Sequence, residues 1–282
     1  MRALPLLLLL APAAWAQERV DRRWAVDPDC SIRISSTVGV IRVSGWDRDT
    51  LAVTADIPKG AGGFYGSGKG KLAKLGVERS EYSRSPGATL VIRLPRQARV
   101  WIKTVSAEVE VTGLDGEVDV SAVSGSAHVS GSPRVLTVET LEGSVTAELG
   151  RGVARLRTGA GPIRVQAAGG DVTAISVDGR VELESPRLAR ARLESVGGAV
   201  RFSGNLEPGG GLEIETHAGD IELRFNGPVN AEFDLTAVAG AVRGDLVGKQ
   251  AARKGKSVRF TMGDGGATVT ARTFKATILV SR

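Results

Sequence analysis

Apolar and polar residues alternate in short segments that recur through the centre of the chain. Seven glycines mark the recurrence at spacings of 18, 18, 18, 19, 21 and 21 residues: Gly125, Gly143, Gly161, Gly179, Gly198, Gly219 and Gly240. Positions seven and five before each glycine, and two and four after it, are apolar in 27 of 28 cases, whereas chance placement at 42% hydrophobic content would give about 12. A period of two predicts a strand with one buried face. Each unit therefore carries two short strands joined at this anchor glycine, which suits a tight corner because glycine tolerates positive φ.

A two-strand unit of this length cannot bury its own apolar face, but stacked units can, with parallel strands pairing from unit to unit. The sequence therefore predicts an all-β fold, a single-stranded β-solenoid (β-helix) with coils of about 18–21 residues and two short strands per coil. A helical fold is excluded because the apolar positions do not recur at three and four. A sandwich of alternating strands rarely keeps such a register over seven units.

The pattern extends towards both ends of the chain. It returns at 37–43, at 104–111 with Ala107 in the anchor place, and more loosely at 265–280. We expect one solenoid domain over residues 30–282, preceded by a lead-in over 17–29. Segments 58–76 and 246–258 are rich in Gly, Lys or other polar residues and are expected to be mobile loops. The terminal strand Thr277–Val280 is expected to be an unpaired edge, through which solenoid ends would associate into oligomers.

Residues 1–16 have the layout of a secretory signal peptide. Arg2 is followed by an apolar run over 3–14 and by the cleavage signal Ala14-Trp15-Ala16. The run is about half the ~20 residues that a transmembrane helix needs, and no second apolar stretch follows it. We expect an exported protein without a transmembrane segment in the mature chain, located in the periplasm, on the outer-membrane surface or outside the cell.

The chain is basic, with a net charge of +6 and a sequence pI of about 9.8. Such a charge favours anionic partners, here an acidic glycan or lipid surface, and no nucleic-acid partner is expected. The cations gather in the two polar segments, which makes six residues candidate anionic-ligand contacts: Lys69, Lys71, Lys74, Arg253, Lys254 and Lys256. The alternative is that both segments are simply solvated loops.

No motif predicts catalysis, a cofactor or a metal. Gly63–Gly70 approaches a phosphate-binding loop but lacks the final Ser or Thr and the strand–loop–helix context. His128 and His217 have different offsets from their anchors and no neighbouring ligand, so His217 is expected to pack at a corner and a zinc site is not expected. Cys30 is the only cysteine and is expected to be a small structural residue. Outward charges form either ligand-binding stripes or a solvated sheet face.

A polysaccharide-active β-helix enzyme is the catalytic alternative. Such an enzyme builds its cleft from long loops on several coils, and the constant spacing leaves no room for them. Residues 102–258 contain no Trp or Tyr, so the solenoid wall lacks flat aromatic platforms. Tyr65 and Tyr82, outside that stretch, are the candidates that remain.

Short motifs in order along the chain resemble the bacterial putative-adhesin family, a domain of unknown function in exported proteins. The resemblance covers roughly residues 30–280 and rests on 39–47, Leu94-Pro95, 100–106, Val123-Ser124-Gly125 and 263–266. It implies a right-handed β-solenoid and a role in adhesion, and it carries over no catalytic residue. Ala107 and Ala276 depart from the glycine that is usual at the turn.

These observations together predict an exported, non-catalytic, adhesin-like interaction module of the cell envelope or surface. It would bind through a sheet wall or through the basic segments. A structural envelope protein without a specific ligand is the alternative.

Overall fold

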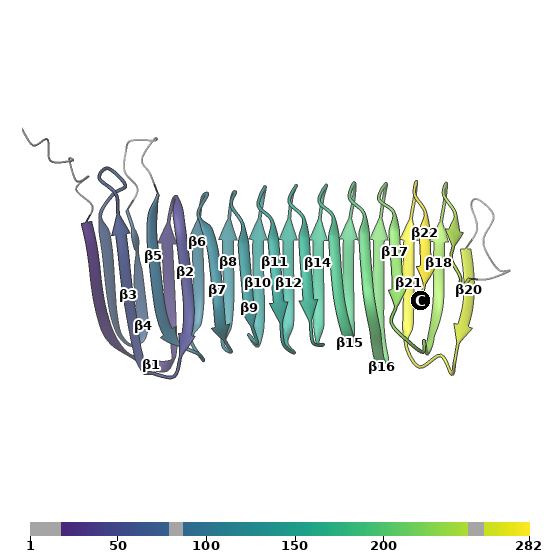
Figure 1. The fold of residues 1–282 in the computed structure, drawn as a ribbon, viewed down its shortest axis with the longest axis horizontal. Helices are drawn as coiled ribbons and strands as arrows, with labels where there is room; N and C mark the ends of the chain where they lie inside the picture. The colour runs from purple at the N-terminus through teal and green to yellow at the C-terminus, as the bar shows by residue number, and fades with distance from the viewer. Residues whose placement is uncertain (1–17, 79–86, 248–256) are drawn as a thin grey trace, which may run out of the picture.

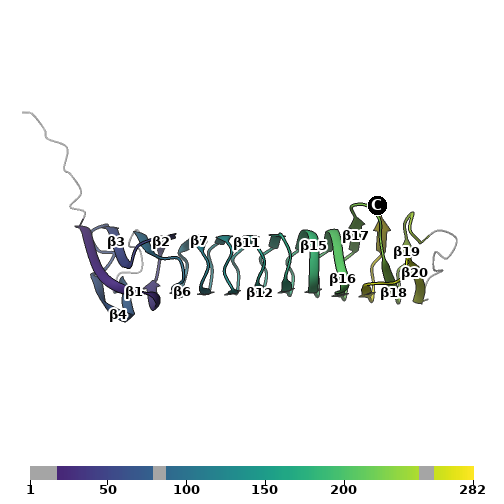
Figure 2. The ribbon, with the colours of Figure 1, turned by 90° about the horizontal axis from the view of Figure 1, so that it is seen from below.

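The computed structural model describes residues 18–78, 87–247 and 257–282, and every element in these ranges is a β-strand. All 22 strands belong to one sheet. Figures 1 and 2 show a long, flat rod with strands running across its long axis in two layers. The all-β prediction is confirmed. The expected signal peptide lies outside the described residues.

The strands in chain order are β1 (Glu18–Ser36), β2 (Gly39–Trp46), β3 (Thr50–Ile57), β4 (Phe64–Val77), β5 (Ala88–Pro95), β6 (Arg99–Thr104), β7 (Glu108–Leu114), β8 (Glu117–Ala122), β9 (Ala127–Gly131), β10 (Val135–Thr140), β11 (Val145–Leu149), β12 (Val153–Thr158), β13 (Ile163–Ala167), β14 (Asp171–Ser176), β15 (Val181–Ser195), β16 (Val200–Thr216), β17 (Ile221–Phe225), β18 (Ala231–Ala237), β19 (Val242–Arg243), β20 (Ser257–Met262), β21 (Thr268–Thr273) and β22 (Ile278–Ser281).

The central strands form two parallel rows, one for each half of the sequence unit. The first row holds the strands that precede an anchor residue, and the second row holds those that follow it. In the first row Leu136 of β10 pairs with Ala154 of β12, 18 residues further along the chain. In the second row Val145 of β11 pairs with Ile163 of β13, again 18 residues on. Strands β15 and β16 are long because each contributes one half to each row.

The core lies between the rows and contains the apolar positions predicted from the sequence. All 27 of those residues are buried; in the unit at Gly179 they are Val172, Ala174, Val181 and Leu183. Burial of about 25 cal/mol per Å² of apolar surface makes this continuous core the main stabilising contribution.

The anchor glycines are required by close packing rather than by backbone conformation. Of the seven, only Gly125 has a positive φ, of 107°. A β-carbon added at Gly179 would overlap the carbonyl oxygen of Gly161, and one added at Gly143 would overlap that of Gly125. The reason given by the sequence is therefore corrected: each corner stacks directly on its neighbour's backbone.

A hydroxyl group closes most of these corners. Three residues before the anchor, Ser176 Oγ accepts a hydrogen bond from Gly179 N at 2.8 Å, and Ser195 Oγ accepts one from Gly198 N at 3.0 Å. Thr104 Oγ1 accepts the equivalent bond from Ala107 N at 3.0 Å. These side chains are buried, so their small size and their hydrogen bond both matter.

Both ends of the rod are interleaved. The pair β1 and β2 lies between β4 and β5 on one side and β6 and β7 on the other. At the opposite end, β21 and β22 lie between β16 and β17 and the pair β18 and β19. The prediction that Thr277–Val280 forms an unpaired edge is therefore wrong, because the chain first builds β18 and β19 further out and then returns.

Antiparallel strands close the two ends. Strand β3 pairs antiparallel with Glu18–Ala25 of β1 and with β5, and β20 pairs antiparallel with β18. The expected lead-in over 17–29 is thus part of β1 from Glu18 onward.

The segment expected to be a mobile loop at 58–76 is largely the strand β4. Its glycines misled the sequence interpretation because glycine is depleted in strands. A β-carbon at Gly66 would lie 2.9 Å from the Trp24 ring, and one at Gly68 would lie 3.1 Å from the Trp24 side chain. The glycines therefore make room for an indole. Most of the second expected loop, 246–258, lies outside the described residues.

We expect Gly179→Ala to destabilise the fold by about 2 kcal/mol or more, because the methyl group has no space between stacked corners. Gly211→Ala is the matched control, because a β-carbon there meets only Arg190 Cγ at 4.0 Å. The control should be neutral or slightly stabilising. Urea unfolding followed by circular dichroism measures both, and equal stability of the two variants would contradict the stacking account.

Candidate functional site

Outward side chains of the first row stand in ladders along the rod. Pairing in register places equivalent residues of neighbouring strands about 4.8 Å apart on the same face. Two regions of this outer face are candidates for binding, a groove in the C-terminal half and a basic and aromatic region at the N-terminal end.

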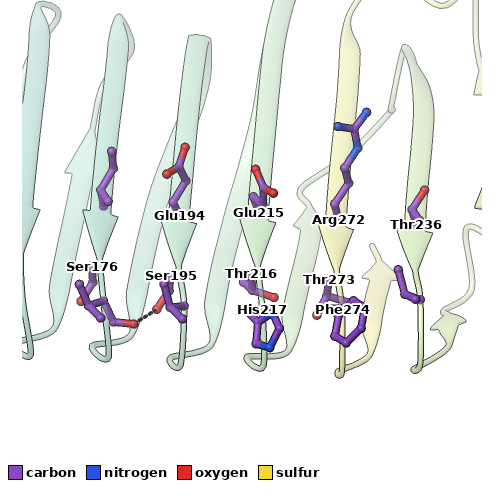
Figure 3. Close-up of a pocket in the computed structure, with 14 residues that line it drawn as sticks. Ser176, Glu194, Ser195, Glu215, Thr216, His217, Thr236, Arg272, Thr273 and Phe274 are labelled. Atoms are coloured by element: carbon purple, nitrogen blue, oxygen red, sulfur yellow. Dashed lines mark hydrogen bonds between the residues drawn. The ribbon is translucent and has the colours of Figure 1, made fainter.

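The groove consists of two adjoining hollows of about 620 Å³ and 630 Å³, and Arg272 of β21 lines both. Figure 3 shows the hollow nearer the corners, with Glu194, Glu215 and Arg272 projecting from neighbouring strands. The second hollow continues across the same strands and includes Arg155 and Arg190.

An exposed apolar ridge borders the groove on the corner side. It comprises the residues two before each anchor, and four of them line the groove at 47–53% exposure: Val177, Val196, Val238 and Phe274. His217 occupies the same ladder position, so it does lie at a corner, but its side chain is exposed. Its ring stacks on Phe274 with centroids 5.1 Å apart and an interplanar angle of 9°. The groove edge is therefore apolar and, at one point, aromatic.

The charges in the groove are balanced. Four arginines, at 155, 190, 192 and 272, face four carboxylates, at 171, 194, 213 and 215. Arg192 forms ion pairs with Glu194 and, at 3.5 Å, with Glu213. A ligand for this groove would therefore present alternating polar groups rather than a single charge.

The second region centres on Arg33 of β1. Arg33 pairs in register with Lys74 of β4 on one side and with Trp101 of β6 on the other. Lys103 follows Trp101 by two residues, on the same face, and Tyr65 lies over Lys74, whose Nζ is 5.4 Å from the ring centroid. We call these five residues the basic–aromatic face.

The six cations singled out in the sequence have different locations. Only Lys74 joins the basic–aromatic face. Lys71 forms an ion pair with Asp29 at 3.4 Å, and Lys69 and Lys71 are exposed on β4 before a register shift in its pairing with β1. Arg253, Lys254 and Lys256 lie outside the described residues, as does Tyr82.

Sequence reasoning missed Arg33, Trp101 and Lys103. Alternation with the buried Val100 and Ile102 was a signal that Trp101 and Lys103 point outward. The neighbourhood of Arg33 had no such signal, because it depends on the interleaved position of β1.

The second row neutralises its own charges. Arg164, Glu182, Arg201 and Glu222 alternate on successive strands, with ion-pair distances of 2.9, 3.5 and 2.8 Å. Partial burial disfavours the charged form of Glu182, but hydrogen bonds and the charges of Arg164 and Arg180 outweigh it and hold the pKa of that carboxyl below its usual range. This pairing is what a solvated sheet face requires.

Cys30 is fully buried in β1. Burial raises the pKa of its thiol to about 11, with smaller contributions from Asp27 and Asp29. The thiol is therefore protonated and shielded at neutral pH, which agrees with a structural role.

Within residues 18–78, 87–247 and 257–282, no group of three or more His, Cys, Asp or Glu side chains is arranged to hold a metal ion. The same ranges contain no helix long and apolar enough to cross a membrane.

No family model and no curated protein matches the chain. Among solved structures, it is similar to a putative adhesin from Bacteroides fragilis, at 10% identity and a TM-score of 0.48 over 94% of this chain and 99% of that one. It is also similar to a putative cell adhesion protein from Clostridium sporogenes, at 12% identity and a TM-score of 0.28 over 94% and 99%. A third is a putative adhesin from Parabacteroides merdae, at 11% identity and a TM-score of 0.34 over 74% and 97%. Their names agree with the expected resemblance, and no function is taken from them.

We expect Glu182→Gln to lower the free energy of unfolding by about 1 kcal/mol at pH 7, because it removes the centre of an ion-pair network. Since the folded-state pKa of Glu182 is depressed, this stability is present above the ordinary pKa and is lost as pH falls through the folded value. The difference from the unchanged protein should therefore shrink in acid. The control is Glu184→Gln, an exposed carboxylate two residues away. Urea unfolding between pH 3 and 7 measures this, and a pH-independent difference would contradict it.

Proposed function

We propose that this chain is an exported, non-catalytic interaction module of the bacterial cell envelope or surface, similar in role to an adhesin. Its two strand rows are the walls of a β-solenoid, and its outer first-row face binds the partner. The periplasm, the outer-membrane surface and the extracellular space are the locations we consider.

The groove is the observation that carries this proposal. It crosses the strands of several stacked units and therefore runs along the rod, with ladder positions repeating about every 4.8 Å. An extended polymer chain would meet the same kind of side chain at each step. The rigid sheet holds these side chains in place before binding, which lowers the entropic cost of association.

The groove also favours binding over a purely structural role. A ridge of half-exposed Val and Phe side chains leaves apolar surface in water, and contiguous exposed apolar surface marks interaction sites. A polysaccharide-active enzyme is not favoured, because the groove's carboxylates are matched by arginines.

Export is tested by expressing the full chain in a bacterial host and sequencing the N-terminus of the fractionated protein. A mature terminus at Gln17 outside the cytoplasm supports the proposal. Retention of Met1 in the cytoplasm would overturn it.

We expect Phe274→Ala combined with His217→Ala to weaken binding to arrayed extended peptides and polysaccharides at least tenfold, because both rings leave the groove edge. Both side chains are exposed, so the fold should survive, and circular dichroism checks this. Val123→Ala is the control, since it removes a ridge residue outside the groove. Absence of binding by the unchanged protein, or equal binding by the double variant, would overturn the groove as the binding site.

A further inference from the structure

We propose that the basic–aromatic face is a binding site for an acidic carbohydrate. It lies at the opposite end of the first row from the groove and shares no residue with it. The inference rests on the proposed interaction role, but it stands or falls separately from the groove.

The cations of this face are available to a ligand. Among the residues that the structure describes, no carboxylate lies within ion-pairing distance of Arg33, Lys74 or Lys103. Neighbouring cations differ: Arg99 pairs with Glu117 at 3.8 Å and Lys71 with Asp29 at 3.4 Å. Three uncompensated positive charges on adjoining strands create a local potential that attracts an anion.

Two aromatic rings lie among these charges. Trp101 is 39% exposed on β6, next to Arg33 in register. Tyr65 is fixed by a 2.6 Å hydrogen bond between its hydroxyl group and Ser35 Oγ. A β-carbon at Gly76 would lie 2.7 Å from the Tyr65 hydroxyl oxygen, so the glycine keeps space for the phenol. Both rings are amphipathic platforms that present an apolar face and retain a polar group.

The arrangement suits a sugar chain that lies along the rod. Lys74, Arg33 and Trp101 follow one another in a single ladder at about 4.8 Å per strand. Lys103 is displaced by two residues along β6, roughly 7 Å to the side. The face thus covers roughly 10 Å by 7 Å. Acidic groups would meet the cations, while the CH face of a sugar ring would lie on the indole.

A flat sheet is less suited to a lipid surface. Peripheral membrane binding requires apolar groups that enter the boundary layer by about 5–10 Å. Within this region only Leu72, at 71% exposure, is a large aliphatic residue that projects so far from the described strands. The observations therefore favour the carbohydrate over an anionic lipid headgroup.

The test uses the mature full-length chain and two polymers with the same backbone, polygalacturonate and its methyl ester. Binding is measured by surface plasmon resonance across a range of salt concentrations. We expect the unchanged protein to bind polygalacturonate at least tenfold more tightly than the neutral ester. The triple variant Arg33→Gln, Lys74→Gln, Lys103→Gln should lose at least tenfold in affinity and show a weaker salt dependence.

A matched triple variant controls for bulk charge. Arg93→Gln, Arg224→Gln and Arg243→Gln remove the same charge from exposed positions elsewhere, and they should leave affinity within about threefold. Trp101→Ala should lose at least fivefold while it keeps the salt dependence, because it removes stacking without removing charge. Circular dichroism confirms folding of every variant.

Three results would overturn the inference. They are no binding to polygalacturonate, equal losses in the two triple variants, and binding to anionic phosphatidylglycerol vesicles without binding to the polymer, which would assign the face to lipid. The groove variant Phe274→Ala, His217→Ala separates the proposals. If it loses the groove's partner but still binds polygalacturonate, both sites stand, and if only polygalacturonate binding is found, the groove alone fails.

Discussion

The contact between successive corner backbones is the constraint on which the rest of the rod depends. At Gly143, Gly161 and Gly179 the corner lies against the preceding carbonyl oxygen with no room for a β-carbon. This contact holds neighbouring strands in register, so that each apolar residue stacks on its equivalent in the core. The same register aligns the outward side chains into ladders. A surface of repeated chemistry is therefore a direct consequence of how the corners pack.

The interleaved ends extend this argument. A stack of parallel strands that stopped abruptly would expose two unpaired edges, which invite association with other chains. Here the terminal units lie one place inside the stack, and the antiparallel strands β3 and β20 cover parts of the outermost layer. As a result, β1 brings Arg33 between Lys74 and Trp101, which are far from it in the sequence. The basic–aromatic face exists because of this return of the chain.

Much of the fold could be predicted because its rule is local. The period of two and the constant spacing identified every core residue of the central units, and all 27 are buried. The ends could not be predicted in the same way, because no local pattern distinguishes Ile278 in an edge strand from Ile278 in an interior one. For β4, the glycines favoured a loop until the packing of Trp24 on Gly66 and Gly68 was known. Of the candidate site, Lys74 was anticipated, while Arg33 required the tertiary arrangement.

The distribution of charge separates the two outer faces. On the second row, Arg164, Glu182, Arg201 and Glu222 alternate, so each charge stabilises its neighbours. On the first row, Lys74 and Arg33 stand opposite one another in register, and like charges in directly opposed positions destabilise a sheet. The cation–π contact between Lys74 and Tyr65 offsets only part of this cost. A fold that pairs its charges elsewhere but leaves these unpaired beside an exposed indole retains electrostatic energy that an anionic ligand would release on binding.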